Sequence, residues 1–324
     1  MPNYSGVWSL PTQMQAQAQG NWPSVFGGGI AVMALGNDGA ATYSTAISQI
    51  SITSTGNATD FGDLTVGRNA LAGFASTVRG VFSGGFDGVA PRSNVIDYVT
   101  IASAGNATDF GDLLTGSNAL AGLSNSTRGL TAGGYPGAFT NVIQYVTIAS
   151  TGNAIDFGDL TVSVYAFAGT SSTTRGVFSG GDSSGGAVNV IQYVTIASTG
   201  NATDFGDLTE AVYNICSGNI SSGVYGYRVG GRQSSPSTSL DTIDYITIAS
   251  TGNAIDFGDM AYGLESGATA SSSTYGLIAG GSTSTSTISY IALSTSGSAS
   301  FFGDLNAAGS LSGTGCCNAY GGLA

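Results

Sequence analysis

Paired aspartates are the residues of this sequence whose types and spacing could do chemistry. Asp60 and Asp63 stand three residues apart in the phrase Asp60-Phe61-Gly62-Asp63-Leu64. Two carboxylates on a tight loop could bind a hard cation such as Ca²⁺, which needs several oxygen ligands. Two carboxylates facing one cleft could instead act as the acid and base of glycoside hydrolysis.

The phrase recurs too often for a catalytic centre. It returns, complete or modified, at residues 109–113, 156–160, 204–208, 256–260 and 301–305. A catalytic site is normally unique, and residues three apart on a strand point to opposite faces. Asp and Gly at strand ends are ordinary turn formers whose side chains cap free backbone amides. We interpret the aspartates as structural, with a repeated cation site as the alternative, and predict no catalytic residue, metal or cofactor.

Histidine and cysteine usage disfavours most familiar hydrolase and oxidase chemistries. The chain has no histidine, which removes the usual general base and the commonest metal ligand. Its three cysteines are Cys216, Cys316 and Cys317. The adjacent pair cannot readily close an ordinary disulfide or a zinc site. We expect these thiols to be small buried or surface groups.

Charge and hydropathy exclude two further classes of partner. The formal net charge is -12, and all seven basic residues are arginines without a basic stripe, so we expect no nucleic-acid partner. Five copies of the phrase contribute two acids each and the last contributes one, so 11 of the 19 acids belong to the repeat. The sequence has no eighteen-residue apolar run and no basic segment ahead of an apolar one at its N-terminus. We therefore expect neither membrane insertion nor a cleaved secretion signal.

The phrases must be positioned by repeated elements. Their glycines fall at 62, 111, 158, 206, 258 and 303, and a period in the forties is typical of a repeat architecture. One unit, residues 69–113, predicts strands at residues 70–75, 79–85, 94–101 and 108–113, with a glycine-asparagine hairpin turn at Gly105-Asn106. Four antiparallel strands form a blade, and blades arranged radially form an all-β propeller.

The unit resembles kelch repeats over roughly residues 20–324. The resemblance rests on paired glycines after the second strand and on a tyrosine in the third strand. The glycine pairs are Gly84-Gly85, Gly133-Gly134, Gly180-Gly181, Gly230-Gly231 and Gly280-Gly281, and the tyrosines are Tyr98, Tyr145, Tyr193, Tyr245 and Tyr290. Phenylalanines stand where kelch blades usually carry tryptophan; they are Phe61, Phe110, Phe157, Phe205, Phe257 and Phe302. The resemblance implies a kelch-like β-propeller of four-stranded blades.

We expect six blades over residues 20–305, with seven as the alternative. Sliding the unit back places residues 22–28 on the first strand of the first blade and residues 31–36 on its second strand. We expect residues 1–19 to be an N-terminal docking or closing segment.

The C-terminal segment, residues 306–324, predicts extra strands that close the ring. These strands either replace the N-terminal pair of the first blade or join residues 6–9 in an incomplete seventh blade. We expect the six-blade closure, which brings the two termini together.

Differences between the blades cluster in the loops after the paired glycines. These loops run over residues 86–93, 135–140, 182–188, 232–241 and 282–287, and we expect them on one face of the propeller. Variable loops on a rigid scaffold often carry recognition. The candidate ligand-binding residues are Phe86, Asp87, Arg92, Tyr135, Asp182 and Arg232. They supply aromatic platforms and charged hydrogen-bonding groups suited to a sugar or a protein surface; alternatively, the loops only form a solvated rim.

The N-terminal segment breaks the period. Met1-Pro2-Asn3-Tyr4-Ser5-Gly6-Val7-Trp8 precedes a glutamine-rich stretch at residues 13–19 and then Asn21-Trp22-Pro23. This opening, together with the repeat phrase from Tyr193 to Leu208, resembles virion structural proteins of tailed bacteriophages, particularly marine ones.

The resemblance implies a non-enzymatic virion appendage, such as a fibre, tail or capsid-surface protein. Its expected partners are other virion proteins, with Trp8 and Trp22 as docking residues, and a glycan or protein of the host envelope. Multiple copies per particle are expected. One alternative is a purely structural virion decoration or connector. Another is a polysaccharide-active enzyme like propeller sialidases or kelch-type copper oxidases, although no histidine is present for copper and no arginine triad is evident.

Overall fold

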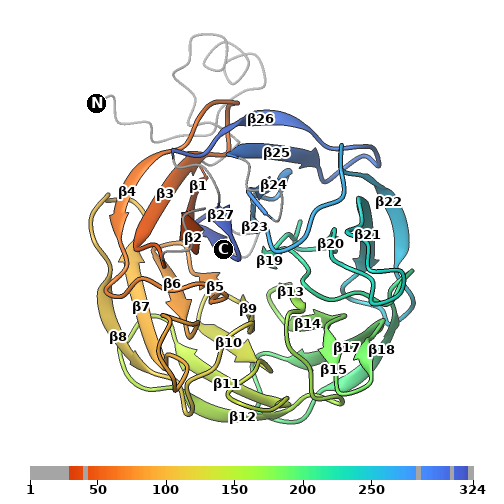
Figure 1. Cartoon of the computed structure of the whole chain (residues 1–324), viewed down its shortest axis with the longest axis horizontal. Helices are drawn as coiled ribbons and strands as arrows, with labels where there is room; N and C mark the ends of the chain where they lie inside the picture. Colours follow the sequence, from red (N-terminus) through yellow and green to blue (C-terminus); the bar gives the residue numbers. More distant parts are fainter. Residues whose placement is uncertain (1–28, 39–42, 282–285, 307–309, 320–324) are drawn as a thin grey trace, which may run out of the picture.

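The computed structural model describes residues 29–38, 43–281, 286–306 and 310–319, and these form a ring of β-sheets (Figure 1). All regular elements of this described part are β-strands, arranged as six four-stranded antiparallel blades around one axis. The all-β propeller and the six-blade count predicted from the repeat are therefore confirmed.

Each blade runs from its innermost to its outermost strand as follows. Blade 1 contains β28 (Thr314–Cys317), β1 (Ile30–Ala34), β3 (Ala46–Ser51) and β4 (Thr59–Asp63). Blade 2 contains β5 (Ala72–Ala75), β6 (Arg79–Ser83), β7 (Val95–Thr100) and β8 (Thr108–Asp112). Blade 3 contains β9 (Ala121–Ser124), β10 (Arg128–Ala132), β11 (Val142–Thr147) and β12 (Ile155–Asp159).

The second half of the ring has the same order with one irregular strand. Blade 4 contains β13 (Ala168–Ser171), β14 (Arg175–Ser179), β17 (Val190–Thr195) and β18 (Thr203–Asp207). Blade 5 contains β19 (Ser217–Gly218), β20 (Tyr225–Val229), β21 (Thr242–Thr247) and β22 (Ile255–Asp259). Blade 6 contains β23 (Ala268–Ser271), β24 (Tyr275–Ala279), β25 (Thr287–Ala292) and β26 (Ser300–Asp304). Strand β19 pairs in parallel with β23 of the next blade, while Ser221 bridges to Gly226 within blade 5.

Two short strand pairs lie in the connections. They are β2 (Asn37–Asp38) with β27 (Ser310–Leu311), and β15 (Asp182–Ser183) with β16 (Gly186–Ala187).

The two inner strands of a blade are buried on both faces because each blade packs between two others. In β6, Gly80, Val81, Phe82 and Ser83 are all buried, whereas a sheet with one solvated face would alternate. The phenylalanine of every repeat phrase is buried too, as its repetition predicted. Phe110, for example, lies at a register shift between β7 and β8 and meets the Tyr98 ring edge to face, with 5.8 Å between the centroids.

The repeat phrase forms a belt around the outside of the ring. Gly200 N donates to Phe157 O of the preceding blade at 2.8 Å, and Ala202 N donates to Asp159 O at 2.7 Å. Asn201 Oδ1 accepts a hydrogen bond from Asp159 N. Equivalent glycine-to-phenylalanine bonds cross all six junctions between blades; the donors are Gly56, Gly105, Gly152, Gly200, Gly252 and Gly297.

This belt corrects the expected two-residue hairpin at Gly105-Asn106. Seven residues separate β7 from β8, because their connection reaches sideways to the outermost strand of blade 1. The glycine of the phrase is needed for that approach. A Cβ on Gly158, whose φ is +146°, would lie 2.5 Å from the carbonyl oxygen of Gly200.

Strand β28 from the C-terminal part of the chain completes blade 1. It pairs antiparallel with β1, with Ala31 opposite Cys317 and Val32 opposite Cys316. The innermost strand of this blade thus comes from residues 314–317. Residues 6–9 and 22–28, the other candidates for closing strands, lie outside the described residues.

Candidate ligand-binding face

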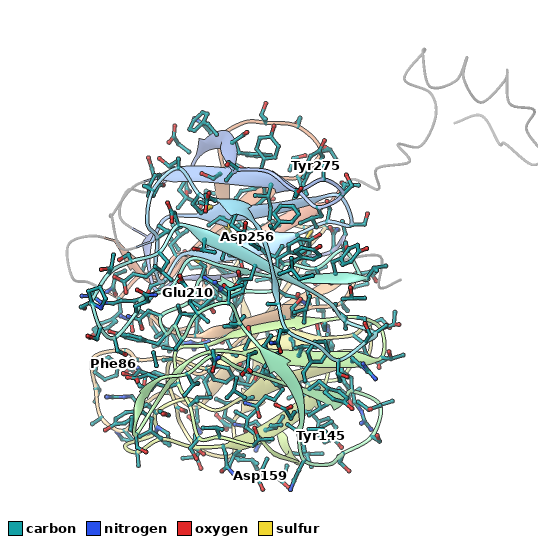
Figure 2. All side chains as sticks on the ribbon, turned by 90° about the vertical axis from the view of Figure 1, so that its right-hand side faces the viewer. Phe86, Tyr145, Asp159, Glu210, Asp256 and Tyr275 are labelled. Carbon is teal, nitrogen blue, oxygen red and sulfur yellow. The ribbon has the colours of Figure 1, made fainter. Side chains whose placement is uncertain are left out.

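The paired glycines place the variable loops at one end of the propeller, which we call the Gly-Gly face. Gly85 has a φ of +110°, and a Cβ there would lie 2.7 Å from the carbonyl oxygen of Asn69. The loop then folds over the linker before the blade, since Asn69 and Phe86 exchange two backbone hydrogen bonds of 2.9 Å. In a side view, Phe86 and Glu210 lie on this face, whereas Tyr145 and Tyr275 lie on the opposite face (Figure 2).

Phe86, Asp87 and Arg92 form one cluster on the blade 2 loop. The Arg92 guanidinium carbon lies 4.2 Å from the centroid of the Phe86 ring, and Arg92 Nε donates to Asn118 Oδ1 at 3.2 Å. Tyr43 meets the same phenylalanine edge to face at 5.5 Å. Asp87 Oδ1 accepts a hydrogen bond from Val89 N within the loop. One face of the Phe86 ring is therefore covered by Arg92.

Tyr135 and Asp182 lie on neighbouring loops that a second tyrosine, Tyr165, connects. The rings of Tyr135, Phe139 and Tyr165 pack with centroid distances of 5.7, 5.8 and 5.5 Å, and we call these three residues the aromatic patch. All three are half-buried. Tyr165 Oη donates to Asp182 Oδ2 at 3.2 Å. The patch therefore places aromatic rings beside a carboxylate.

The electrostatics of the patch favour a neutral phenol. Desolvation raises the pKa of Tyr165 above its usual value, and the negative charge of Asp182 raises it further. The phenol therefore remains a hydrogen-bond donor to the carboxylate throughout the physiological pH range.

Arg232 is bonded within the propeller. Its Nη1 atom lies 2.9 Å from Glu265 Oε1, and its Nε and Nη2 atoms donate to Ser237 Oγ at 2.9 and 2.7 Å. Ser239 Oγ donates to the same glutamate oxygen, and Asn214 Nδ2 donates to the other. The hydrogen bond and charge of Glu265 raise the pKa of Arg232. This arginine connects blade 5 to the linker that precedes blade 6.

All six predicted residues lie on the Gly-Gly face, on loops that hydrogen bonds connect. Asn118 accepts from Arg92 through its side chain and from Tyr135 N through its backbone carbonyl. On the far side of Asp182, Ala187 N donates to Ser234 Oγ of the next loop. Trp8 and Trp22 lie outside the described residues.

Four residues that contact the predicted ligand-binding residues were not identified from the sequence: Asn118, Phe139, Tyr165 and Glu265. Three of them, Asn118, Tyr165 and Glu265, share one position: each stands immediately before a residue with left-handed backbone, and the inner strand begins two residues after that residue. Alignment of the linkers between blades would have shown one variable side chain per blade at this position.

A pocket lies on the propeller axis. It is formed where the inner strands begin, on the side of the Gly-Gly face. Its volume is about 70 Å³. It is surrounded by six residues with φ between 50° and 58°: Ala70, Ala119, Ala166, Asn214, Ser266 and Ser312. Ala119 N donates to Ala70 O at 2.7 Å, and the same bond recurs at four further steps around the ring. Because these amides bond to one another, they do not form an anion site.

The aspartates of the repeat phrase are exposed or, at Asp112, Asp159 and Asp304, half-buried. Asp60 and Asp63 are exposed, and Asp63 Oδ1 accepts a hydrogen bond from Thr45 Oγ1 at 2.7 Å. Backbone amides are capped instead by the asparagines of the belt, which corrects the capping role expected for Asp. Within the described residues, no group of three or more His, Cys, Asp or Glu side chains could hold a metal ion.

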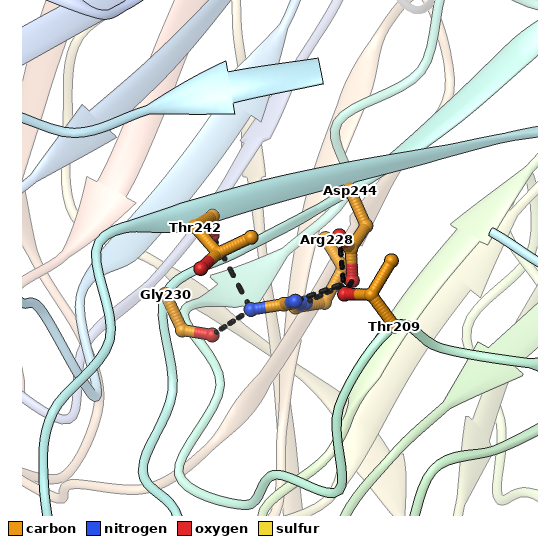
Figure 3. Close-up of polar contacts among 5 residues, drawn as sticks. All are labelled: Thr209, Arg228, Gly230, Thr242 and Asp244. Carbon is orange, nitrogen blue, oxygen red and sulfur yellow. Dashed lines mark hydrogen bonds and ion pairs between the residues drawn. The ribbon is translucent and has the colours of Figure 1, made fainter. Parts of the chain in front are cut away.

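Asp97 on β7 and Asp244 on β21 are fully buried carboxylates. Arg228 and Asp244 form an ion pair inside blade 5, with Arg228 Nη1 also donating to Gly230 O at 2.6 Å (Figure 3). Thr209 Oγ1, from the preceding linker, donates to Asp244 Oδ1 at 2.8 Å (Figure 3). The equivalent pair in blade 2 is Arg68 with Asp97, at 2.8 Å. The Arg68 pair joins blade 2 to the linker before it, whereas the Arg228 pair lies within blade 5, and both pairs are closed to solvent.

Searches among known protein families and curated proteins find no match to this chain. In the described part of the chain, no helix has the length and apolar character needed to span a membrane. Since propellers host many functions, function has to be argued from the side chains that this one presents.

Proposed function

We propose that this protein is a kelch-like, non-enzymatic virion protein of a tailed bacteriophage whose Gly-Gly face binds glycans of the host surface. The observation that carries the proposal is the aromatic patch of Tyr135, Phe139 and Tyr165 beside Asp182. Sugars present apolar C–H faces that pack on aromatic rings and hydroxyl groups that bond to carboxylates. The phage-like N-terminal sequence supports placing this surface on a virion.

The chemistry of the face suits weak, repeated binding. The patch is made of only three half-buried rings, so a single contact should be weak. Several copies on one particle would convert weak contacts into firm attachment, because each bound copy raises the effective concentration of the next.

The first experiment measures binding of the fluorescently labelled protein to a panel of marine bacterial cells. Saturable binding is expected, and it should disappear after enzymatic or chemical removal of surface polysaccharide. Absence of binding by a folded sample would reject the glycan-binding role. Binding that survives removal of polysaccharide would indicate a protein receptor instead.

A variant carrying Tyr135→Ser and Phe139→Ser should bind cells about tenfold more weakly, because one aromatic stacking surface is lost. Val89→Ser is the matched control, since Val89 is 66% exposed on the blade 2 loop and lies outside the patch. Circular dichroism melting checks that both variants fold. Equal binding by the double variant and the control would contradict the patch assignment.

A purely structural virion role is the second candidate. It is favoured by the internal bonding of Arg92 and Arg232, which occupies guanidinium groups that a receptor would otherwise contact. A folded protein that binds no cells but co-purifies with particles would support this role.

A further inference from the structure

Three blades fill the gap to the next blade with an arginine. Arg79, Arg128 and Arg175 occupy the first position of the second strand in blades 2, 3 and 4. Each guanidinium carbon lies over the third-strand tyrosine of its own blade, 4.5 Å from Tyr98, 4.7 Å from Tyr145 and 4.6 Å from Tyr193. The arrangement is a repeated cation–π contact.

Each arginine also bonds to the backbone of the next blade. Arg128 Nη1 donates to Ile196 O at 3.1 Å and to Ala197 O at 2.9 Å. Arg175 Nη1 donates in the same way to Ile248 O and Ala249 O, and Arg79 Nη1 donates to Ile148 O. The receptor for a guanidinium is therefore one tyrosine ring and one or two carbonyl oxygens just after the next third strand.

Blades 5 and 6 carry Tyr225 and Tyr275 at the arginine position. Between blades 5 and 6, Tyr227 occupies the junction, and its hydroxyl donates to Leu293 O at 2.6 Å. Leu293 is the counterpart of Ile196, so the carbonyl acceptor of this junction is satisfied from within the chain.

The junction between blades 6 and 1 keeps the third-strand tyrosine and the carbonyl oxygens, but Tyr275 stands in place of the arginine and meets Tyr290 edge to face, with 5.6 Å between the centroids. Leu277 stands where Tyr227 stands in blade 5, and a pocket of about 170 Å³ lies between the blades. Tyr275, Tyr290 and Phe302 line it from blade 6, and residues 52–55 line it from blade 1. Tyr290 is the counterpart of Tyr145, while Ile52 and Thr53 are the counterparts of Ile196 and Ala197. Among the described residues, none donates a hydrogen bond to the carbonyl oxygens of Ile52 and Thr53.

We propose that this pocket binds the guanidinium group of an arginine side chain from a partner protein. A planar, delocalised cation can pack against the Tyr275 and Tyr290 rings that line the pocket while its N–H groups reach the carbonyl oxygens of Ile52 and Thr53, as the chain's own arginines reach the equivalent carbonyls in three other junctions. The net charge of -12 favours a cationic partner.

The occupant comes from another kind of protein. All seven arginines of the chain are described, and each is engaged within the propeller: Arg68, Arg79, Arg92, Arg128, Arg175, Arg228 and Arg232. A second copy therefore has no uncommitted arginine to donate. The pocket faces away from the aromatic patch, so this proposal stands apart from cell binding.

The test follows the NMR signals of Ile52 and Tyr290 during titration with blocked arginine, N-acetyl-arginine methylamide. Saturable shifts at both residues are expected. Blocked lysine should bind about tenfold more weakly, because its compact ammonium cannot reach both carbonyls while lying on the ring. Absence of a saturable shift with blocked arginine, or equal binding of blocked lysine, would overturn the proposal.

Substitutions distinguish binding of blocked arginine in the pocket from non-specific binding elsewhere on the surface. Tyr275→Arg should supply the missing guanidinium from within the chain and abolish binding of blocked arginine. Tyr225→Arg is the matched control, since its junction is already filled by Tyr227, and it should bind like the unmodified protein. Tyr290→Leu keeps an apolar side chain but removes the ring, so it should also lose binding. It provides the test if Tyr275→Arg does not fold. Retained binding in the folded variants of Tyr275 or Tyr290 would overturn the assignment.

Discussion

Asp97 and Asp244 are fully buried carboxylates, and each pairs with an arginine that is also buried. Removing one partner of such a pair leaves an uncompensated charge in a medium that solvates it poorly. At the residue scale, these pairs are the points of the ring that are most sensitive to single substitutions.

Asp244→Ala should lower the free energy of unfolding by about 3–5 kcal/mol, because Arg228 then loses its counter-charge inside blade 5. Urea unfolding followed by circular dichroism measures the change. The control is Asp60→Ala, an exposed aspartate of the repeat phrase, which should change stability by no more than about 0.5 kcal/mol. Equal changes in the free energy of unfolding for the two substitutions would show that the buried ion pair contributes no more to stability than an exposed aspartate.

The three cysteines should be unreactive and should make the fold alkali-sensitive. Burial raises the pKa of Cys216 and Cys317 to about 12 from 9.0, and it raises the pKa of Cys316 as well. The folded state favours the protonated thiols, so their contribution to stability is fully present below pH 9.0 and is lost as pH rises toward 12.

Thiol titration with a chromogenic disulfide at neutral pH should label the unfolded protein and leave the folded protein unlabelled. The free energy of unfolding, measured in urea at increasing pH, should fall above pH 9.0. Rapid labelling of the folded protein would mean that these thiols are not buried. Single Cys→Ala variants identify which thiol is responsible.

At the scale of elements, the outer belt depends on glycines that approach the next blade. Gly158→Ala should destabilise the protein by more than about 1 kcal/mol, because φ at this position is +146° and the new Cβ would meet the carbonyl oxygen of Gly200. Gly297→Ala is the matched control, since a Cβ there would meet nothing within 4 Å. Thermal melts of both variants test this. Equal melting midpoints would mean that the outer belt accommodates the added methyl group at Gly158 without loss of stability.

The elements themselves were largely predictable. Paired glycines and runs of β-branched residues located the second, third and outermost strands of blade 2 to within two residues at each end. The glycine-asparagine step was misread because a tight hairpin and a sideways belt both need residues that tolerate unusual backbone angles. Local sequence cannot distinguish between them, since the partner of the belt lies some forty residues away.

At the scale of the whole molecule, strand β28 closes the ring against β1. Removing residues 314–324 should leave blade 1 with an unpaired inner edge at the axis, because repeat units need neighbours to bury their apolar faces. The shortened protein is expected to unfold at a lower urea concentration, or to associate through the open edge. Size-exclusion chromatography and urea unfolding detect these outcomes. A monomer with an unchanged unfolding midpoint would show that closure adds no stability.

The sequence by itself determined the all-β class, the blade, the radial arrangement and the face that carries the variable loops, because strand and turn preferences act over a few residues and recur with the period. Only the tertiary structure decided which residues meet across blades. It placed Tyr165 between Tyr135 and Asp182, bonded Arg232 inward to Glu265, and left the junction of blades 6 and 1 without the arginine that fills three others. These contacts join residues one or more repeats apart, so they depend on how the ring brings neighbouring blades together.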